Sequence, residues 1–376
     1  MEELIQLRQE LHKHPEVSGK ETETAQRIID FLSKYKPNEI ITNLGGNGLL
    51  AIYKGNEEGN TILFRCELDA LPIQEINSFE YKSVYEGVSH KCGHDGHMAI
   101  ICGLAKKLHQ NPLKQGTVML LFQPAEEDGS GAKSVVSDEK FKDIKVDYAF
   151  ALHNLPGYPL HQIVIKENTF TCAVNSIIIQ LQGKTSHASE PENGNNPALA
   201  ISEIISAYNV KIQADITKEN YCLITPIHIN MGEKAYGVSA GYGEVHFTVR
   251  SDSNAFMQNT ERELEKIASD IALKYNLKSN ILWTESFQAN ENNKEAVNYI
   301  KESALKLNLD ILEKELPFSF GEDFGLITQQ FKGAMFGLGA GEKSPSLHNP
   351  DYDFPDEIIN TGSTLFYQIT KEILDA

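Results

Sequence analysis

The first half of the chain alternates between two spacings of its hydrophobic residues. Some segments repeat them every third or fourth position, as an amphipathic helix does, and others form short continuous runs typical of buried strands. The predicted helices cover about residues 2–14, 21–35 and 95–109, and the predicted strands cover 48–54, 61–66, 117–122 and 148–153. Helices that alternate with strands in this way favour an α/β fold with a mainly parallel sheet.

The order of elements changes after about residue 170. The pattern there predicts a strand, a helix, two strands, a second helix and a last strand, "KSNILWTES". This β-α-β-β-α-β order is the ferredoxin-like arrangement. The chain then returns to a helix, a Gly-rich strand and a closing helix from about residue 356. We therefore expect a discontinuous α/β domain of residues 1–169 and 286–376, with a ferredoxin-like α+β domain of residues 170–285 inserted into it.

The composition narrows the classes of partner. The 376 residues contain 34 Lys and Arg against 52 Asp and Glu, a formal net charge of −18. Nucleic acids and anionic membrane surfaces attract basic proteins, so neither is an expected partner. No stretch approaches the roughly 20 apolar residues of a spanning helix, and the first residues lack the features of a signal peptide. Five cysteines without a secretion signal predict reduced thiols in the cytoplasm.

The segment "HKCGHDGHMA", residues 90–99, is the first candidate for a metal-binding site. It places Cys92 and His94 where a loop runs into a helix, so that both can point the same way. Thiolate and imidazole are ligands of divalent transition metals. The alternative for this segment alone is a polar helix cap followed by a surface histidine. The chain has no CxxC motif, in which two cysteines are separated by two other residues, so a structural zinc knuckle is not expected.

Further metal-competent residues follow other predicted strands. Glu126 and Glu127 of "FQPAEE" are neighbouring carboxylates that need water, a proton or a cation, although a solvated acidic loop would also explain them. His153 ends another strand and His348 lies in a Pro-rich loop, and each alone would be read as structural. Ligands of α/β sheets bind beyond the carboxyl ends of the strands. The convergence of these segments predicts one shared metal site there.

Taken together, the motifs resemble a family of dinuclear-metal amidohydrolases and peptidases related to aminoacylase and carboxypeptidase G. The nearest branch contains hippurate hydrolase, indole-acetyl-amino-acid hydrolases and N-acetyldiaminopimelate deacetylase. The resemblance implies a catalytic domain of the zinc-exopeptidase type and an inserted lid domain that also mediates dimers. The motifs span nearly the whole chain in one order: "LRQELHKHPE", "ETETAQRI", "ELDALP", "HKCGHDGHMA", "FQPAEE", "ALHNLP", "GKTSHAS", "GEDF" and "LHNPDYDF".

The resemblance implies two divalent metal ions and a ligand set for each. Cys92 would bridge the two ions as a thiolate. His94 and His153 would complete one site, and Glu127 and His348 would complete the other. Zinc or manganese would be the metal, with cobalt or nickel as alternatives, because the set mixes soft and hard ligands.

The resemblance also implies catalytic roles for three further residues. Glu126 would be the general base that takes a proton from the attacking water. Asp69 of "ELDALP" would hold a ligand histidine in place, and His187 of the lid would help to hold the oxygen of the substrate. This chain departs from its relatives at Gly237, where an asparagine that touches the substrate is usual and glycine cannot replace its amide. His228 and His246, in lid strands, are expected to be structural.

The function that follows is the metal-dependent hydrolysis of the amide bond in small N-acyl amino acids or amino-acid conjugates. A dipeptidase or carboxypeptidase of the same family is one alternative, although a cysteine at the bridging position favours the amidohydrolase branch. A metal-binding protein that has lost turnover is another, although its ligand set or its Glu126 would be broken. The expected partners are the N-acyl substrate and a second copy of the chain, joined through the lid.

Overall fold

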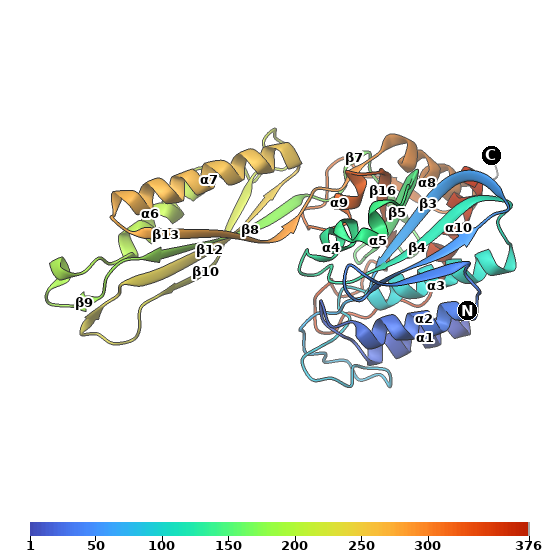
Figure 1. Ribbon diagram of the computed structural model, residues 1–376, viewed down its shortest axis with the longest axis horizontal. Helices are drawn as coiled ribbons and strands as arrows, with labels where there is room; N and C mark the ends of the chain where they lie inside the picture. Colours follow the sequence, from blue (N-terminus) through green and yellow to red (C-terminus); the bar gives the residue numbers. More distant parts are fainter. Residues whose placement is uncertain (375–376) are drawn as a thin grey trace. The chain divides into compact units, whose positions relative to one another are not determined.

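The computed structural model describes residues 1–374, which divide into two compact units (Figure 1). The first contains Met1–Phe170, Asn290–Glu315 and the chain from Asp323 onward. The second contains Thr171–Ala289 and the short segment Leu316–Glu322. The sequence analysis predicts that this short segment belongs to the larger domain, which it expects to include residues 286–376. In the structure its backbone joins the second unit, because Phe318 accepts a hydrogen bond of 2.9 Å from the Cys172 amide.

The first unit is built on one eight-stranded sheet. Its four middle strands, β4, β3, β5 and β16, are parallel to one another, while the pairs β1–β2, β2–β4 and β16–β6 are antiparallel. Two short strands, β7 (Asn168–Thr169) and β14 (Glu291–Asn292), pair outside this sheet. In spatial order the eight strands are β1 (Glu39–Leu44), β2 (Gly48–Lys54), β4 (Gln115–Gln123), β3 (Glu57–Glu67), β5 (Tyr148–Leu155), β16 (Lys332–Gly339), β6 (Ile163–Ile165) and β15 (Ile311–Glu313).

Five long helices share the hydrophobic core of this unit with alternate residues of the middle strands. Helix α3 lies among the sheet, α1 and α10, and every residue from 94 to 105 is buried, so the helix is apolar on nearly all sides. Three short helices, α4 (Gly131–Ser137), α5 (Glu139–Lys142) and α9 (Gly325–Thr328), contact β4, β1 and β16. The long helices are α1 (Glu2–Lys13), α2 (Thr22–Ser33), α3 (His94–Gln110), α8 (Lys294–Lys306) and α10 (Ile358–Leu374).

The second unit is an antiparallel sheet with two helices on one face. Alternate residues of the two central strands, such as Ile179 and Phe247, are buried and share a hydrophobic core with α6 (Ala198–Asn209) and α7 (Asn254–Lys274). A small pair, β9 (Ser186–His187) and β11 (Val238–Ser239), and the 3-10 turn η1 (Pro191–Asn193) lie outside this sheet. Its strands, in spatial order, are β10 (Leu223–Met231), β12 (Tyr242–Ser251), β8 (Ala173–Gln182) and β13 (Lys278–Phe287).

The expected fold class is confirmed in both parts. The larger sheet is parallel at its middle, and the smaller unit follows the ferredoxin-like order of strands and helices. The pattern missed β1, β6 and β15, which lie at or near the edges of the larger sheet. The strands β6 and β15 have three residues each, too few to show a period, and β1 has only one buried residue. No helix of residues 1–374 is long and apolar enough to cross a membrane.

Candidate metal centre

The carboxyl ends of three parallel strands bring the predicted residues to one edge of the larger sheet. Asp69 follows β3, the pair Glu126–Glu127 follows β4, and His153 lies near the end of β5. Helix α3 begins at the same edge with His94 as its first residue. Side chains far apart in the sequence therefore meet there because parallel strands end side by side.

The ligand atoms form two sets that share one sulfur. Cys92, His94 and His153 make one set and Cys92, Glu127 and His348 the other, and in each set the ligand atoms lie within 4.8 Å of one another. The Cys92 sulfur is 3.4 Å from His153 Nε2, and His348 Nε2 is 3.7 Å from a Glu127 carboxylate oxygen. Ligand atoms of one tetrahedral zinc ion lie about 3.3–3.7 Å apart, so the spacing suits two ions bridged by a thiolate.

Glu126 lies beside these two sets and belongs to neither. Its Oε2 atom is 3.8 Å from His94 Nε2, the same distance that separates this nitrogen from Glu127 Oε1. The Glu126 side chain is buried. One glutamate of the pair can therefore bind a metal while the other faces the same space from the side.

Hydrogen bonds to backbone carbonyls orient His94 and His153, the two histidines of the first candidate set. The Nδ1 atom of His94 donates to the carbonyl oxygen of Asp69 at 2.8 Å, and that of His153 donates to the carbonyl of Asn154 at 2.9 Å. A carbonyl oxygen only accepts, so Nδ1 carries a proton in each ring, and Nε2 is the atom that can bind a metal ion once it carries no proton. The buried Nε2 atom of His94 has no hydrogen-bond partner among residues 1–374. A cation is the partner that fits there, because a buried acceptor left without one is costly.

The charges around the centre also favour the binding of a cation. Burial alone would lower the pKa of His94, but the side-chain carboxylate of Asp69 and the nearby carboxylates of Glu67 and Glu127 raise the pKa to about 10. Burial lowers the pKa of His153 to about 3, so this ring is neutral as a metal ligand must be. The protein thus surrounds His94 with negative charge that a proton balances when no metal ion does.

Backbone conformations with positive φ cluster around the ligands. Gly93, between Cys92 and His94, has φ +95°, and a Cβ atom there would lie 2.6 Å from the Asn154 side chain. Ala125 and His348 also have positive φ, at 50° and 66°. Such strain persists only where surrounding contacts impose it. Two of these contacts are the hydrogen bonds from the Ala125 amide to Glu21 and from the His348 amide to the Lys91 carbonyl, at 2.9 and 2.8 Å.

A buried aspartate holds both ends of the loop that carries the two glutamates. Asp323, of the "GEDF" motif, accepts hydrogen bonds from the Gln123 side chain at 2.7 Å and from the Ala132 amide at 2.8 Å. The buried Arg65 guanidinium binds the same carboxylate. Sequence reasoning gave Arg65 no role in the site. The one available signal was a charged residue, Arg65, inside the otherwise apolar run "TILFRC".

A line of buried polar groups supports the ligands from behind. Arg65 pairs with Glu67, and Glu67 lies 2.6 Å from Nδ1 of His97. The Nε2 atom of His97 lies 2.6 Å from the side-chain oxygen of Asn154, the residue after the ligand His153. His97 thus ties the first turn of α3 to the end of β5.

His187 lies in the second unit. It belongs to β9, is exposed, and its Nδ1 atom accepts a hydrogen bond of 2.7 Å from the Ser189 hydroxyl. Its neighbour Ala188 donates to the carbonyl of Gly237, the residue that departs from the pattern of relatives. Its role toward a substrate stays a prediction.

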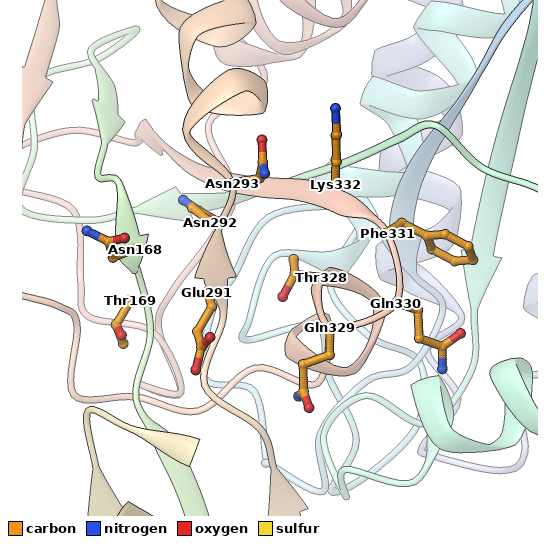
Figure 2. Close-up of a pocket in the computed structure, with 10 residues that line it drawn as sticks. All are labelled: Asn168, Thr169, Glu291, Asn292, Asn293, Thr328, Gln329, Gln330, Phe331 and Lys332. Carbon is orange, nitrogen blue, oxygen red and sulfur yellow. The ribbon is translucent and has the colours of Figure 1, made fainter. Parts of the chain in front are cut away.

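A separate pocket of about 630 Å³ lies in the first unit and contains none of the predicted metal ligands (Figure 2). Asn292 lines it, but its amide is already engaged. It donates to the carbonyls of Lys166 and Met335 at 2.9 and 2.7 Å and accepts from the Met335 amide at 2.8 Å. This amide therefore serves the fold, and we assign the pocket no ligand.

Comparisons with known proteins agree with this fold. The model of the family described as Peptidase family M20/M25/M40 matches residues 63–372. N-acetylcysteine deacetylase of Bacillus subtilis (strain 168) is 29% identical over 373 residues, which are 99% of this chain and 97% of the relative. N-acetyldiaminopimelate deacetylase of Lactobacillus helveticus is 31% identical over 366 residues, 94% and 93% of the two chains. A solved Bacillus subtilis protein, described as a dinuclear metal binding peptidase from the M20 family, has a TM-score of 0.83 and 29% identity, covering 100% of this chain and 98% of its own.

Proposed function

We propose that this chain, which belongs to the peptidase family M20/M25/M40, hydrolyses the amide bond of small N-acyl amino acids or amino-acid conjugates with the help of bound metal ions. The observation that carries the proposal is the pair of ligand sets that share the Cys92 sulfur, with the buried Glu126 beside them. Relatives named as deacetylases of N-acetylated amino acids support this class of substrate.

The donor set fits two divalent ions. Cys92 would bridge them, with His94 and His153 on one ion and Glu127 and His348 on the other. The thiolate and imidazoles favour zinc, cobalt or nickel, while the carboxylate admits manganese, and we propose zinc or manganese. When bound, such ions lower the pKa of water and polarise the carbonyl oxygen of the substrate.

The residues around the ligands would handle the proton and the position of the groups. Glu126 would take the proton of the attacking water and pass it to the leaving amine nitrogen. Asp69 would hold two ligands at once, because its carbonyl accepts from His94 and its carboxylate accepts from the Glu127 amide at 2.9 Å. We assign to His187, in the second unit, the role of donating to the developing oxyanion.

A hydrolysis panel tests the proposal. Metal-stripped protein would be given N-acetyl and N-benzoyl amino acids, N-acetyldiaminopimelate and dipeptides, with manganese, zinc, cobalt or nickel added back. We expect turnover only with metal and loss of turnover in Glu126→Gln with both ions still bound. Glu342→Gln, at an exposed position, is the matched control and should retain turnover. A Glu126→Gln variant that turns over normally would refute the assignment, and a preference for dipeptides would favour the peptidase alternative.

We further propose that the second unit pairs with a second copy of the chain through β10. This strand ends the smaller sheet and bonds only to β12 among the described strands. It exposes Ile227 and Ile229, which are 62% and 53% accessible. An exposed edge strand of this kind can pair with a strand of another chain. Ile229→Lys should give a monomer by light scattering, while Val210→Lys, exposed elsewhere in the unit, should not. A dimeric Ile229→Lys variant would contradict this interface.

We also place the protein in the cytoplasm. Its five cysteines are all buried, and none forms a disulfide within the described chain. Reduced thiols are the usual state of cysteine in that compartment.

A further inference from the structure

Lys91, the residue before the bridging candidate Cys92, is a buried lysine that the proposed mechanism does not use. Its side chain is 0% accessible. Lysine is almost never buried in this way unless its charge is paired. The Lys91 Nζ atom donates to the Glu75 carboxylate at 2.6 Å and to the backbone carbonyl of Tyr352 at 2.7 Å. The second of these partners lies shortly after His348 in the chain.

The main chain of Lys91 holds the other end of the same segment. The His348 amide donates to the Lys91 carbonyl at 2.8 Å. The segment from residue 348 to residue 352 is thus bonded to one residue at both ends. Between these ends, the Ile76 amide adds a hydrogen bond of 3.2 Å to the Pro350 carbonyl. The bonds to Lys91 therefore contribute strongly to where this segment lies.

His348 depends on such main-chain bonds more than the other two candidate histidines do. His94 and His153 are buried, and the ring of each donates to a backbone carbonyl. The side chain of His348 is instead 52% accessible. Its backbone has φ +66°, a conformation that persists only where surrounding contacts impose it. The position of this ligand is therefore set mainly by the main chain that Lys91 holds.

Glu75 keeps the Lys91 ammonium in place. Its Oε1 atom accepts from Lys91 and also from the Nε2 atom of His12, at 3.0 Å. Its Oε2 atom accepts from the Ser83 amide at 2.6 Å. Burial would raise the pKa of Glu75, but hydrogen bonds from His12 and Lys91 lower the pKa to about 2. The carboxylate is therefore ionised at neutral pH and balances the buried positive charge.

We propose that Lys91 is a positioning residue for the metal ion of the second ligand set, which Glu127 and His348 complete, an inference that rests on the proposed function. Its ammonium holds the segment that presents His348 Nε2 to the Glu127 carboxylate, 3.7 Å away. Without the ammonium, the buried Tyr352 carbonyl keeps only one hydrogen-bond donor among the described residues, the Asn77 side chain at 3.4 Å. A buried acceptor that loses its partner is costly, so the segment shifts toward water and moves His348 with it.

A chelator titration of the full chain tests this role. Zinc-loaded protein would be titrated with a competing chelator to obtain the dissociation constants of both ions. We expect Lys91→Met to raise one constant by about 10-fold and to leave the other unchanged, because contacts that position a ligand change metal affinity by this order. Lys343→Met, at an exposed position before the same segment, is the matched control and should change neither constant. Should Lys91→Met fail to fold by circular dichroism, Lys91→Gln, which retains a hydrogen-bond donor, replaces it with the same expectation.

A double variant separates positioning from general destabilisation. His348→Ala removes the ligand itself, so adding Lys91→Met to it should cause no further loss of affinity. A lysine that only stabilised the fold would weaken the binding of both ions, and would do so in either background. Unchanged constants in Lys91→Met, or a further loss in the double variant, would overturn the proposal. The readout uses no substrate, so a wild type that binds two ions but hydrolyses nothing would count against the proposed turnover and not against this role.

Discussion

Replacing Gly93 by alanine tests how the fold holds the two ligands on either side of this residue. Gly93 has φ +95°, which costs a residue with a side chain about 1–2 kcal/mol. Its new Cβ atom would also lie 2.6–2.9 Å from three atoms of the Asn154 side chain. Overpacking of a buried site costs a further 1–3 kcal/mol or so. We therefore expect Gly93→Ala to lower the free energy of unfolding by roughly 2–5 kcal/mol.

Gly87→Ala is the matched control. Gly87 has φ +75°, but a Cβ atom there meets nothing within 4 Å, so only the backbone cost of about 1–2 kcal/mol remains. The assay is urea unfolding of both metal-free variants, followed by competition with a chelator for the bound metal. Because displaced Asn154 adjoins His153 and contacts His97, only Gly93→Ala should also lose metal affinity, by about 10- to 100-fold. Equal stability and affinity in the two variants would refute the reasoning.

Two further predictions concern buried charges. Asp323→Asn should lower kcat by about 10- to 100-fold in steady-state kinetics at saturating metal, with KM little changed, because the loop of Glu126 and Glu127 loses its anchor; an unchanged kcat would contradict this role. Burial would lower the pKa of His12, but hydrogen bonds to Asp95 and Glu75 raise it to about 9. Its stabilisation is therefore complete below the unfolded pKa of about 6.5 and is lost as the pH rises toward 9, on the order of 3 kcal/mol. Urea titrations across this range should show that loss in the wild type and a flatter profile in His12→Asn, and equal profiles would refute it.

The sequence predicted that the candidate ligands meet at one edge of the sheet because their placement follows from local rules. Each of Glu127, His153 and His94 lies at the end of a strand or the start of a helix, and parallel strands bring such positions together. The ferredoxin-like order was equally readable, because each of its elements is long and periodic.

The supporting contacts could not be read in the same way. Arg8 reaches Asp353 across 345 positions of the chain, and Gln123 reaches Asp323 across 200. Nothing in the local pattern of either residue indicates its partner. The bulge before His228 could not be predicted either. It shifts by one position the alternation of side chains between the two faces of β10, and only the pairing of β10 with β12 reveals this shift. The short strands β6 and β15, near and at one edge of the sheet, could not be predicted because three residues are too few to show a period.

A titration of metal-free protein with cobalt(II) tests the central claim most directly. The claim is that one sulfur, that of Cys92, belongs to two ligand sets. Absorbance reports sulfur-to-cobalt charge transfer, and mass spectrometry of the dialysed protein reports the number of tightly bound ions. The account predicts two tight ions per chain, with a charge-transfer band that grows on binding and is absent in Cys92→Ser, which should also lose at least one ion. One tight ion in the wild type, or two in Cys92→Ser, would contradict it.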